Sequence, residues 1–303
     1  MKALAGYIVA GRWQAIAVTA VSAVLAFLFP PLHYLGAATV ALVTLHVGKF
    51  EGLQVLVMAC VLAVLFYLLA GIPAVVIVVL LAMLWLPCWF IAVVLQQTGS
   101  LAQALKAAAL LGVCMLLLLY AFFGDQAEWW LQRLNELVVE LKAAGFDLQQ
   151  LSEPVLQRIA ALMSGVILAS LLLGITASLL LARWWQSLLV HPGGFRDDFY
   201  QLRLGVPAGL LTLGIIVLAG VLQGLTGDLA AQLTMILLVP YLLTGLAVIH
   251  CLLGRAGRGN GWLIALYIML AFVPQAMLVL AGGGLLDTWV DFRRRLGGTG
   301  DEH

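Results

Sequence analysis

The sequence predicts an all-α membrane protein: a polytopic transmembrane helical bundle of about eight or nine segments, with an amphipathic helical insert outside the bilayer. Hydrophobic residues make up 64% of the 303 residues and charged residues 10%, against roughly 45–50% and about 25% in soluble domains. The apolar residues also form runs. From Leu53 to Leu105 there is no Asp, Glu, Lys, Arg or His, which is room for two crossings of about 20 residues each.

The N-terminal half predicts five of these segments. A first run, from Trp13 to Phe29, is expected to be a retained first helix, because no small-residue cleavage site precedes Pro30-Pro31. Leu35–Val47 has only about 13 apolar residues, so it is expected to be a short or tilted span or a re-entrant piece. Leu53–Ala70 and Ile72–Leu95 are expected to form an antiparallel hairpin around Gly71, with a kink at Pro87 in the second. Ser100 with Gln103 predicts the start of a fifth segment, Leu101–Phe123.

An extramembrane insert is predicted over residues 124–158. Six acidic and three basic residues lie between Asp125 and Arg158. Asp125 and Glu128 form a capping-box pattern, and Gly145 is expected to end the helix. Asp147 with Gln150 predicts a short second turn, and Ser152-Glu153-Pro154 predicts the start of the next helix. The apolar stripe of this amphipathic helix consists of Trp130, Leu134, Leu137 and Leu141.

The C-terminal half predicts four more segments, and the chain is expected to be a single membrane domain over residues 1–303. These segments are 155–182, 205–222, 229–253 and 262–281. A charged C-terminal helix and tail is expected over residues 285–303. The positive-inside rule favours a cytoplasmic N-terminus and cytoplasmic loops at 183–205 and 254–261. Nine full crossings would place Arg293, Arg294 and Arg295 outside, against the positive-inside rule. Either the run 262–290 folds back at Pro274 instead of crossing, or the arginines do lie outside; we favour a cytoplasmic C-terminus.

The sequence carries no recognised catalytic or metal-binding motif. It has no Walker lysine loop, GxSxG, HExxH or CxxC, and the four cysteines are interpreted as small buried hydrophobes. We therefore expect no enzymatic activity, no metal and no cofactor. Basic residues are scattered over loops and ends, which argues against nucleic acid binding. No charged residue falls in the middle of a predicted span, which makes an autonomous proton-coupled transporter unexpected, and His46 and His250 are interpreted as interface residues.

Two polar clusters are the candidate partner-binding or gate-forming sites. Local helical pairing of Asp287 and Asp291 with Arg294 or Arg295 would explain the second cluster without a function. If both clusters are cytoplasmic, Asp197 or Asp198 could pair with the C-terminal arginines. The first cluster comprises His191, Phe195, Arg196, Asp197, Asp198 and Arg203, and the second comprises Asp287, Asp291, Arg293, Arg294 and Arg295.

The order of these features resembles the YybS-like family of bacterial multi-pass membrane proteins, over nearly the whole chain. The specific motifs are "FRDDFYQLRLGVP" (195–207) and "GLLDTWVDFRRRL" (284–296). The resemblance implies a location in the bacterial cytoplasmic (inner) membrane. More distantly, it implies a relation to the substrate-binding S components of energy-coupling-factor transporters and to the cell-shape protein MreD. Both act only with partner proteins.

Two functions are therefore expected. The first is a small-molecule binding or transport subunit, with a ligand among the spans and energy supplied by a partner membrane protein or ATPase. The second is a non-catalytic scaffold or assembly protein, acting through its 183–205 loop and C-terminus. Small residues such as Gly165, Gly174 and Ala177 serve either sliding contacts or plain tight packing. A cavity of about 300 Å³ or more with convergent polar groups would favour binding, and a solidly packed bundle would favour the scaffold.

Overall fold

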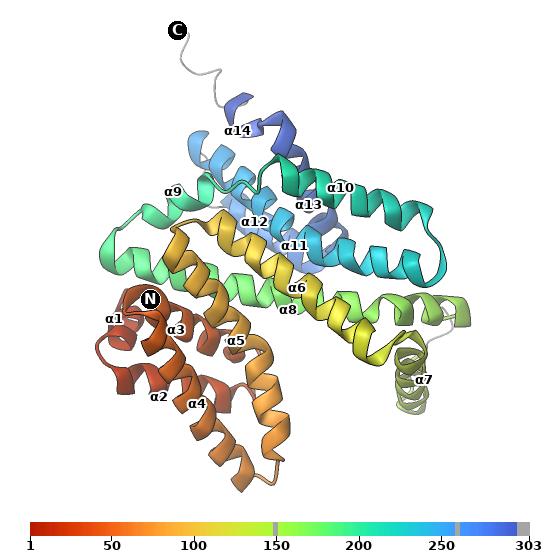
Figure 1. Ribbon diagram of the computed structural model, residues 1–303, viewed down its shortest axis with the longest axis horizontal. Coiled ribbons are helices and arrows are strands. Elements are labelled where there is room, and N and C mark those ends of the chain that lie inside the picture. The colour runs from red at the N-terminus through yellow and green to blue at the C-terminus, as the bar shows by residue number, and fades with distance from the viewer. Residues whose placement is uncertain (148–150, 258–260, 296–303) are drawn as a thin grey trace. The chain divides into compact units, whose positions relative to one another are not determined.

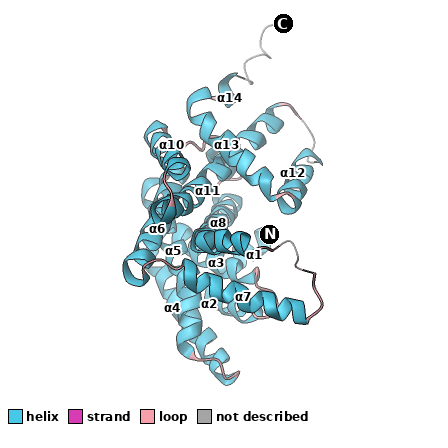
Figure 2. Cartoon of the chain, turned by 90° about the vertical axis from the view of Figure 1, so that its right-hand side faces the viewer, coloured by secondary structure: helices cyan, strands magenta, loops and turns pink. Residues whose placement is uncertain are grey.

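The computed structural model describes residues 1–147, 151–257 and 261–295, and every regular element in these ranges is a helix (Figure 1, Figure 2). Five helices are long and apolar enough to cross a membrane: α4 (Lys49–Leu69), α5 (Ala74–Thr98), α6 (Leu101–Phe123), α8 (Glu153–Val190) and α11 (Gly224–Arg255). Two bent pairs, α1 (Lys2–Val9) with α2 (Arg12–Leu25) and α12 (Gly261–Phe272) with α13 (Pro274–Val290), raise the number to seven if each is one span. The multi-pass helical architecture is thus confirmed, and the count of eight or nine segments is not.

The helices form two compact units. Unit 1 comprises Met1–Ala108, Leu171–Arg203 and Ala247–Gly259, and unit 2 comprises Ala109–Ser170, Leu204–Leu246 and Asn260–His303. The boundaries fall inside α6, α8 and α11, so each of these helices contributes residues to both units. The single membrane domain expected over residues 1–303 stays a prediction.

Helix α3 (Leu32–His46) is the core of unit 1. Every residue from Gly36 to Leu45 is buried, and α2, α4 and α5 pack around the helix. Its 15 residues give a length of about 22 Å, short of a bilayer core of about 30 Å. The run Leu35–Val47, interpreted as a short span or re-entrant piece, is thus part of a short helix. Its residues are apolar on every side, because other helices of unit 1 surround it.

The first predicted segment is corrected by the structure. A single helix was expected from Trp13 to Phe29, but α2 ends at Leu25 and the chain bends by 120° between α1 and α2. A turn precedes Pro30-Pro31, because a residue before proline is disfavoured in the helical conformation. The α4–α5 hairpin is confirmed, with Gly71 at φ +78° in the connection. Helix α5 continues through Pro87.

The predicted insert contains α7 (Ala127–Ala143) in unit 2, a helix that has no buried residue, and its position outside the bilayer stays a prediction. The Asp125 carboxylate accepts a hydrogen bond from the Ala127 amide at 3.0 Å, and Gly145 at φ +91° follows the helix. The second turn expected from Asp147 with Gln150 falls on residues 148–150, outside the described ranges. In the part that the structure describes, the helix and its end before Gly145 agree with the prediction.

The C-terminal part of unit 2 contains α10 (Val206–Val221), α12, α13 and α14 (Phe292–Arg295). Helices α12 and α13 meet at Val273 with a bend of 118°, which suits either a broken span or a run that folds back, so the expected fold-back at Pro274 stays a prediction. A Cβ on Gly284 would overlap the Tyr241 carbonyl oxygen, and one on Gly245 would overlap that of Leu280. Glycine thus lets the backbones of α11 and α13 touch, as in small-residue packing of membrane helices.

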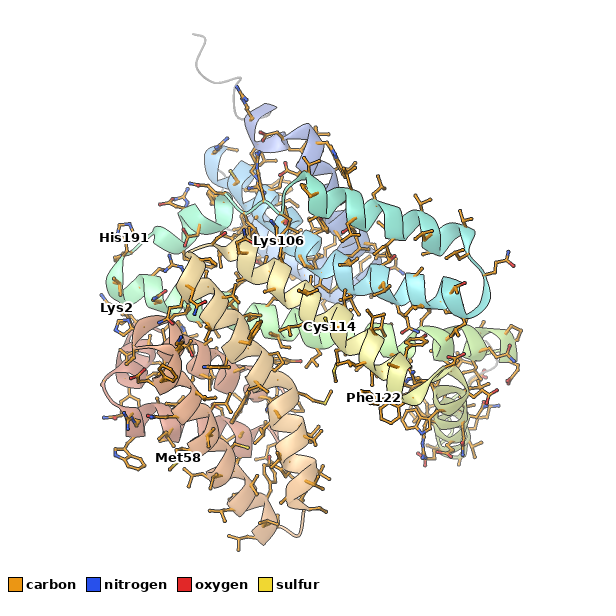
Figure 3. The ribbon with its side chains drawn as sticks, viewed as in Figure 1. Lys2, Met58, Lys106, Cys114, Phe122 and His191 are labelled. Atoms are coloured by element: carbon orange, nitrogen blue, oxygen red, sulfur yellow. The ribbon has the colours of Figure 1, made fainter. Side chains whose placement is uncertain are left out.

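Large apolar side chains cover much of the outside of the spans. Met58 on α4 is 41% exposed and Phe122 on α6 is 78% exposed (Figure 3). A soluble protein does not expose apolar surface on this scale. Lipid is the surrounding that makes such a surface stable.

Candidate functional site

The first predicted cluster lies in unit 1 on α9 (Gly194–Tyr200) and the turn before it. Arg183 near the end of α8 contacts Asp198 through both Nε (3.0 Å) and Nη2 (2.6 Å). The Arg183 Nη1 group donates to Gln186 Oε1 at 2.8 Å, and Gln186 donates in turn to the carbonyl oxygen of Leu45 at 2.8 Å. This chain of contacts fixes α9 and α8 to the end of α3.

Aromatic packing holds the same helix against the end of α11. The rings of Phe195 and Phe199 stack at 5.6 Å, and Phe199 meets His250 edge-on at 5.7 Å. The Arg196 guanidinium lies 5.0 Å from the centre of the Tyr200 ring. The histidine expected at an interface thus contacts a buried phenylalanine of α9, and most of this cluster holds the helix in place.

Four residues of the first cluster are at the surface. His191, Arg196, Asp197 and Arg203 are exposed, and Figure 3 places His191 at the turn between α8 and α9. Gly193 in that turn has φ +98°, a conformation that favours glycine. The structure thus separates a packed face of α9 from a surface face.

The second predicted cluster lies in unit 2 and differs from the expected helix. Helix α13 ends at Val290, and Asp291 adopts φ +53°. Because of this break, Asp287 does not share a helical face with Asp291 and the arginines. Instead Asp287 Oδ2 pairs with Arg293 Nη2 at 3.3 Å, with the two side chains 1% and 5% exposed. Asp287 Oδ1 also accepts a hydrogen bond from the Phe292 amide at 2.9 Å.

Arg294 and Arg295 are the remaining arginines of the second cluster. Arg294 is exposed, and its amide donates to Asp291 Oδ1 at 3.2 Å. The side chain of Arg295 and residues 296–303 lie outside the described residues. Asp198 forms an ion pair with Arg183, and Arg293 forms one with Asp287. The expected pairing of Asp197 or Asp198 with the C-terminal arginines stays a prediction.

A third polar group, not predicted as a site, lies within unit 2, and we call it the Gln232 cluster: Tyr120, Gln126, Trp130, Ser164 and Gln232. Trp130 Nε1 on α7 donates to Ser164 Oγ at 2.9 Å, and Ser164 Oγ donates to Gln126 Oε1 at 3.2 Å. Gln232 Nε2 on α11 lies 2.9 Å from the Tyr120 hydroxyl and donates to the Ala161 carbonyl oxygen at 2.7 Å. The cluster joins helices α6, α7, α8 and α11.

Gln232 has an incompletely satisfied side chain. It is 3% exposed, and its Oε1 has no hydrogen-bond partner among the described residues. The amide orientation is fixed, because only the nitrogen can donate to the Ala161 carbonyl. Gly165 makes the close packing possible, since a Cβ there would lie 2.7 Å from Gln232 Cβ. One turn closer to the starts of α8 and α11, Arg158 and Asp228 form an ion pair.

The small residues and the cysteines, interpreted from the sequence as packing residues, are buried in part. Gly165 and Gly174 are tight contacts, the second against the Tyr34 ring, whereas Ala177 is exposed. Cys88 and Cys251 are buried, Cys60 is half-buried and Cys114 is exposed on α6, so the expectation of four buried cysteines is confirmed for two residues and wrong for Cys114. Among the described residues, no three His, Cys, Asp or Glu side chains group closely enough to hold a metal ion.

Two hollows are lined entirely by described residues. One, of about 500 Å³, is a wide, open depression along one side of α7. The other, of about 210 Å³, lies in unit 1 and is lined by parts of α1 to α4. The smaller hollow is below the 300 Å³ expected of a site for a drug-sized ligand, and the larger one is a surface feature of a single helix.

Comparisons of the chain with protein-family models, with curated proteins and with solved structures found no match.

Proposed function

We propose that this protein is a non-catalytic membrane subunit that binds a small polar molecule at the Gln232 cluster. The observation that carries the proposal is the buried Oε1 of Gln232, which has no donor among the described residues. Leaving a buried acceptor unsatisfied costs about 1–3 kcal/mol, and hydrocarbon supplies no water to offset that loss. A ligand with a hydroxyl or N–H donor would complete the site. Because neither described hollow is lined by this cluster, the ligand would enter only when the helices around Gly165 and Gln232 separate.

The character of the cluster supports a polar ligand. Its side chains are one phenol, one indole, one hydroxyl and two amides, drawn from four helices, and none is ionised. Such convergent neutral groups orient a ligand in an otherwise apolar site. Of the charges near the cluster, Arg158 and Asp228 neutralise one another, and the Asp125 carboxylate, next to Gln126, leaves one negative charge at its edge. The ligand that fits is therefore a molecule without negative charge that has at least one hydrogen-bond donor.

Dependence on a partner is part of the same proposal. The charged residues of the five long helices lie toward the helix ends, as Arg158, Arg183 and Asp228 do. A proton- or sodium-driven cycle usually requires an ionisable group at mid-depth. Energy for ligand release would then come from another chain, as the resemblance to energy-coupling-factor S components implies. A bacterial cytoplasmic membrane is the location that this resemblance implies.

The test is mass spectrometry of small molecules that co-purify with the full-length protein. Wild type should retain a donor-bearing molecule, and Gln232→Leu should lose it. Gln223→Leu, an exposed glutamine in the connection before α11, is the matched control and should retain it. Equal retention by Gln232→Leu and wild type, with both variants folded, would contradict the proposal.

A scaffold function is the second candidate, favoured by the way α9 is held. Its inner face is fixed by Arg183, Gln186 and His250, while Asp197 remains exposed. A rigid helix with an exposed charged side suits recognition of another protein. Protein partners that co-purify with wild type and are lost on Asp197→Lys, with no small molecule retained, would favour this function.

A further inference from the structure

The hollow in unit 1 combines an apolar wall with two opposite charges. Ile and Val side chains of α1, α3 and α4 supply most of the wall of its roughly 210 Å³, among them Val43, Val47 and Val55. The charged side chains are Arg12 and Glu51. Neither has an ion pair or a side-chain hydrogen bond in the part of the chain that the structure describes. We call this hollow the Arg12–Glu51 pocket.

The fold brings Arg12 and Glu51 to the same pocket, because each lies in the first turn of a helix and α3 ends close to Glu51. Arg12 is the first residue of α2, directly after the 120° bend that follows α1. Glu51 lies in the first turn of α4, and α3 ends just before it at His46. The bend and the α3–α4 connection therefore form the mouth, and the packed bodies of α2, α3 and α4 form the floor.

The surroundings of the mouth are those of a membrane interface. Trp13 is 72% exposed and Phe50 is 66% exposed. The ammonium group of Lys49 lies 5.2 Å from the Phe50 ring centre, and Trp89 Nε1 donates to the Lys49 carbonyl oxygen at 2.9 Å. Exposed tryptophan with basic residues is typical of the level of lipid headgroups. The pocket thus opens where headgroups are present.

We propose that the Arg12–Glu51 pocket binds the headgroup of a phospholipid that carries a primary amine. The Arg12 guanidinium matches the phosphate, to which its fork of donors binds bidentately. The Glu51 carboxylate accepts hydrogen bonds from the ammonium, and the valine wall contacts the start of an acyl chain. A choline headgroup fits less well, because a quaternary ammonium has no N–H donor and is held by aromatic rings, none of which lines this pocket.

The test is native mass spectrometry of the full-length protein titrated with phosphatidylethanolamine, phosphatidylcholine and phosphatidylglycerol of identical acyl chains. Wild type should prefer phosphatidylethanolamine over both others. Glu51→Gln should reduce the preference over phosphatidylcholine by on the order of tenfold, the loss of one charge-assisted contact. Arg12→Gln should weaken binding of all three lipids, and Arg12→Lys should keep part of it.

Two matched controls separate the pocket from general surface charge. Lys106→Gln removes an exposed basic residue of unit 1 that lies on another helix and does not line the pocket, and Glu153→Gln removes a carboxylate from another helix start. Both should bind lipid as wild type does. Equal affinity of wild type for phosphatidylethanolamine and phosphatidylcholine would overturn the proposal, as would unchanged selectivity in folded Glu51→Gln. Competition by glycerophosphoethanolamine, which has no acyl chains, at equal concentration would assign the pocket to a soluble molecule and overturn the lipid assignment.

Discussion

Asp287 and Arg293 form an ion pair at 3.3 Å in which neither side chain is more than 5% exposed. The residues are six positions apart, and the pair exists because Asp291 at φ +53° turns the chain back after α13. Burying both ions is costly, and their mutual attraction offsets that cost only while both are present. The pair therefore stabilises the C-terminal turn as a unit and not through either residue alone.

Removal of one partner should be far more damaging than removal of both charges. Arg293→Met leaves the Asp287 carboxylate buried and should lower the free energy of unfolding by about 3–5 kcal/mol. Asp287→Asn combined with Arg293→Met should recover most of this loss, because Asn can still accept the Phe292 amide hydrogen. Thermal unfolding in detergent measures both. Arg294→Met, at an exposed neighbour, is the control and should stay within about 0.5 kcal/mol of wild type.

The Arg183–Asp198 pair should contribute less, because its side chains are 26% and 35% exposed. Asp198→Arg should reduce the melting temperature by an amount equivalent to about 1 kcal/mol or less from the lost attraction, plus the repulsion from Arg183. Adding Arg183→Asp should restore the melting temperature. If Arg294→Asp, at an exposed C-terminal arginine, restores it instead, Asp198 pairs with the C-terminal segment and not with α8.

Adjacent glycines of α13 should respond in opposite ways to alanine. A Cβ at Gly284 would meet the Tyr241 carbonyl oxygen, whereas one at Gly283 has nothing within 4 Å. Gly284→Ala should therefore destabilise the protein by about 1–3 kcal/mol, the usual range for overpacking. Gly283→Ala should be neutral or slightly stabilising. Unfolding of both variants in detergent measures the difference, and equal effects would disprove the backbone contact between α11 and α13.

Local signals in the sequence were sufficient for several elements. The Ser100 cap is observed, with the Gln103 amide 3.4 Å from Ser100 Oγ. Asp125 accepts the amide hydrogen of Ala127 at the start of α7, where Gln126 occupies the N-cap position. Gly71 and Gly145 occupy the turns expected of them. Each of these features depends on residues within a few positions of one another, where capping and turn chemistry act.

Features that depend on tertiary surroundings could not be predicted. The apolar run of α3 gives the same pattern whether lipid or protein surrounds it, so only the structure distinguishes the two. The spacing of Asp287, Asp291 and Arg294 suits a helix, and nothing nearby in sequence signals the break at Asp291. The partners in the Gln232 cluster are separated by up to 112 positions, so a lone glutamine in an apolar run was the only available sign.

The attachment of α7 to the spans should depend on one indole. Trp130 Nε1 donates to Ser164 Oγ at 2.9 Å, whereas the adjacent Trp129 is 52% exposed. Trp130→Phe removes the donor and keeps a ring, so α7 should lose its polar tie to α8 and open more often. Hydrogen–deuterium exchange over residues 127–143 should accelerate by roughly fivefold, the equivalent of one hydrogen bond of about 1 kcal/mol. Trp129→Phe is the matched control and should exchange as wild type does; equal acceleration in both variants would mean that α7 is held by other contacts. Ser164→Ala removes the same bond from the α8 side and also the bond that Ser164 donates to Gln126, so its exchange should be at least as fast as that of Trp130→Phe.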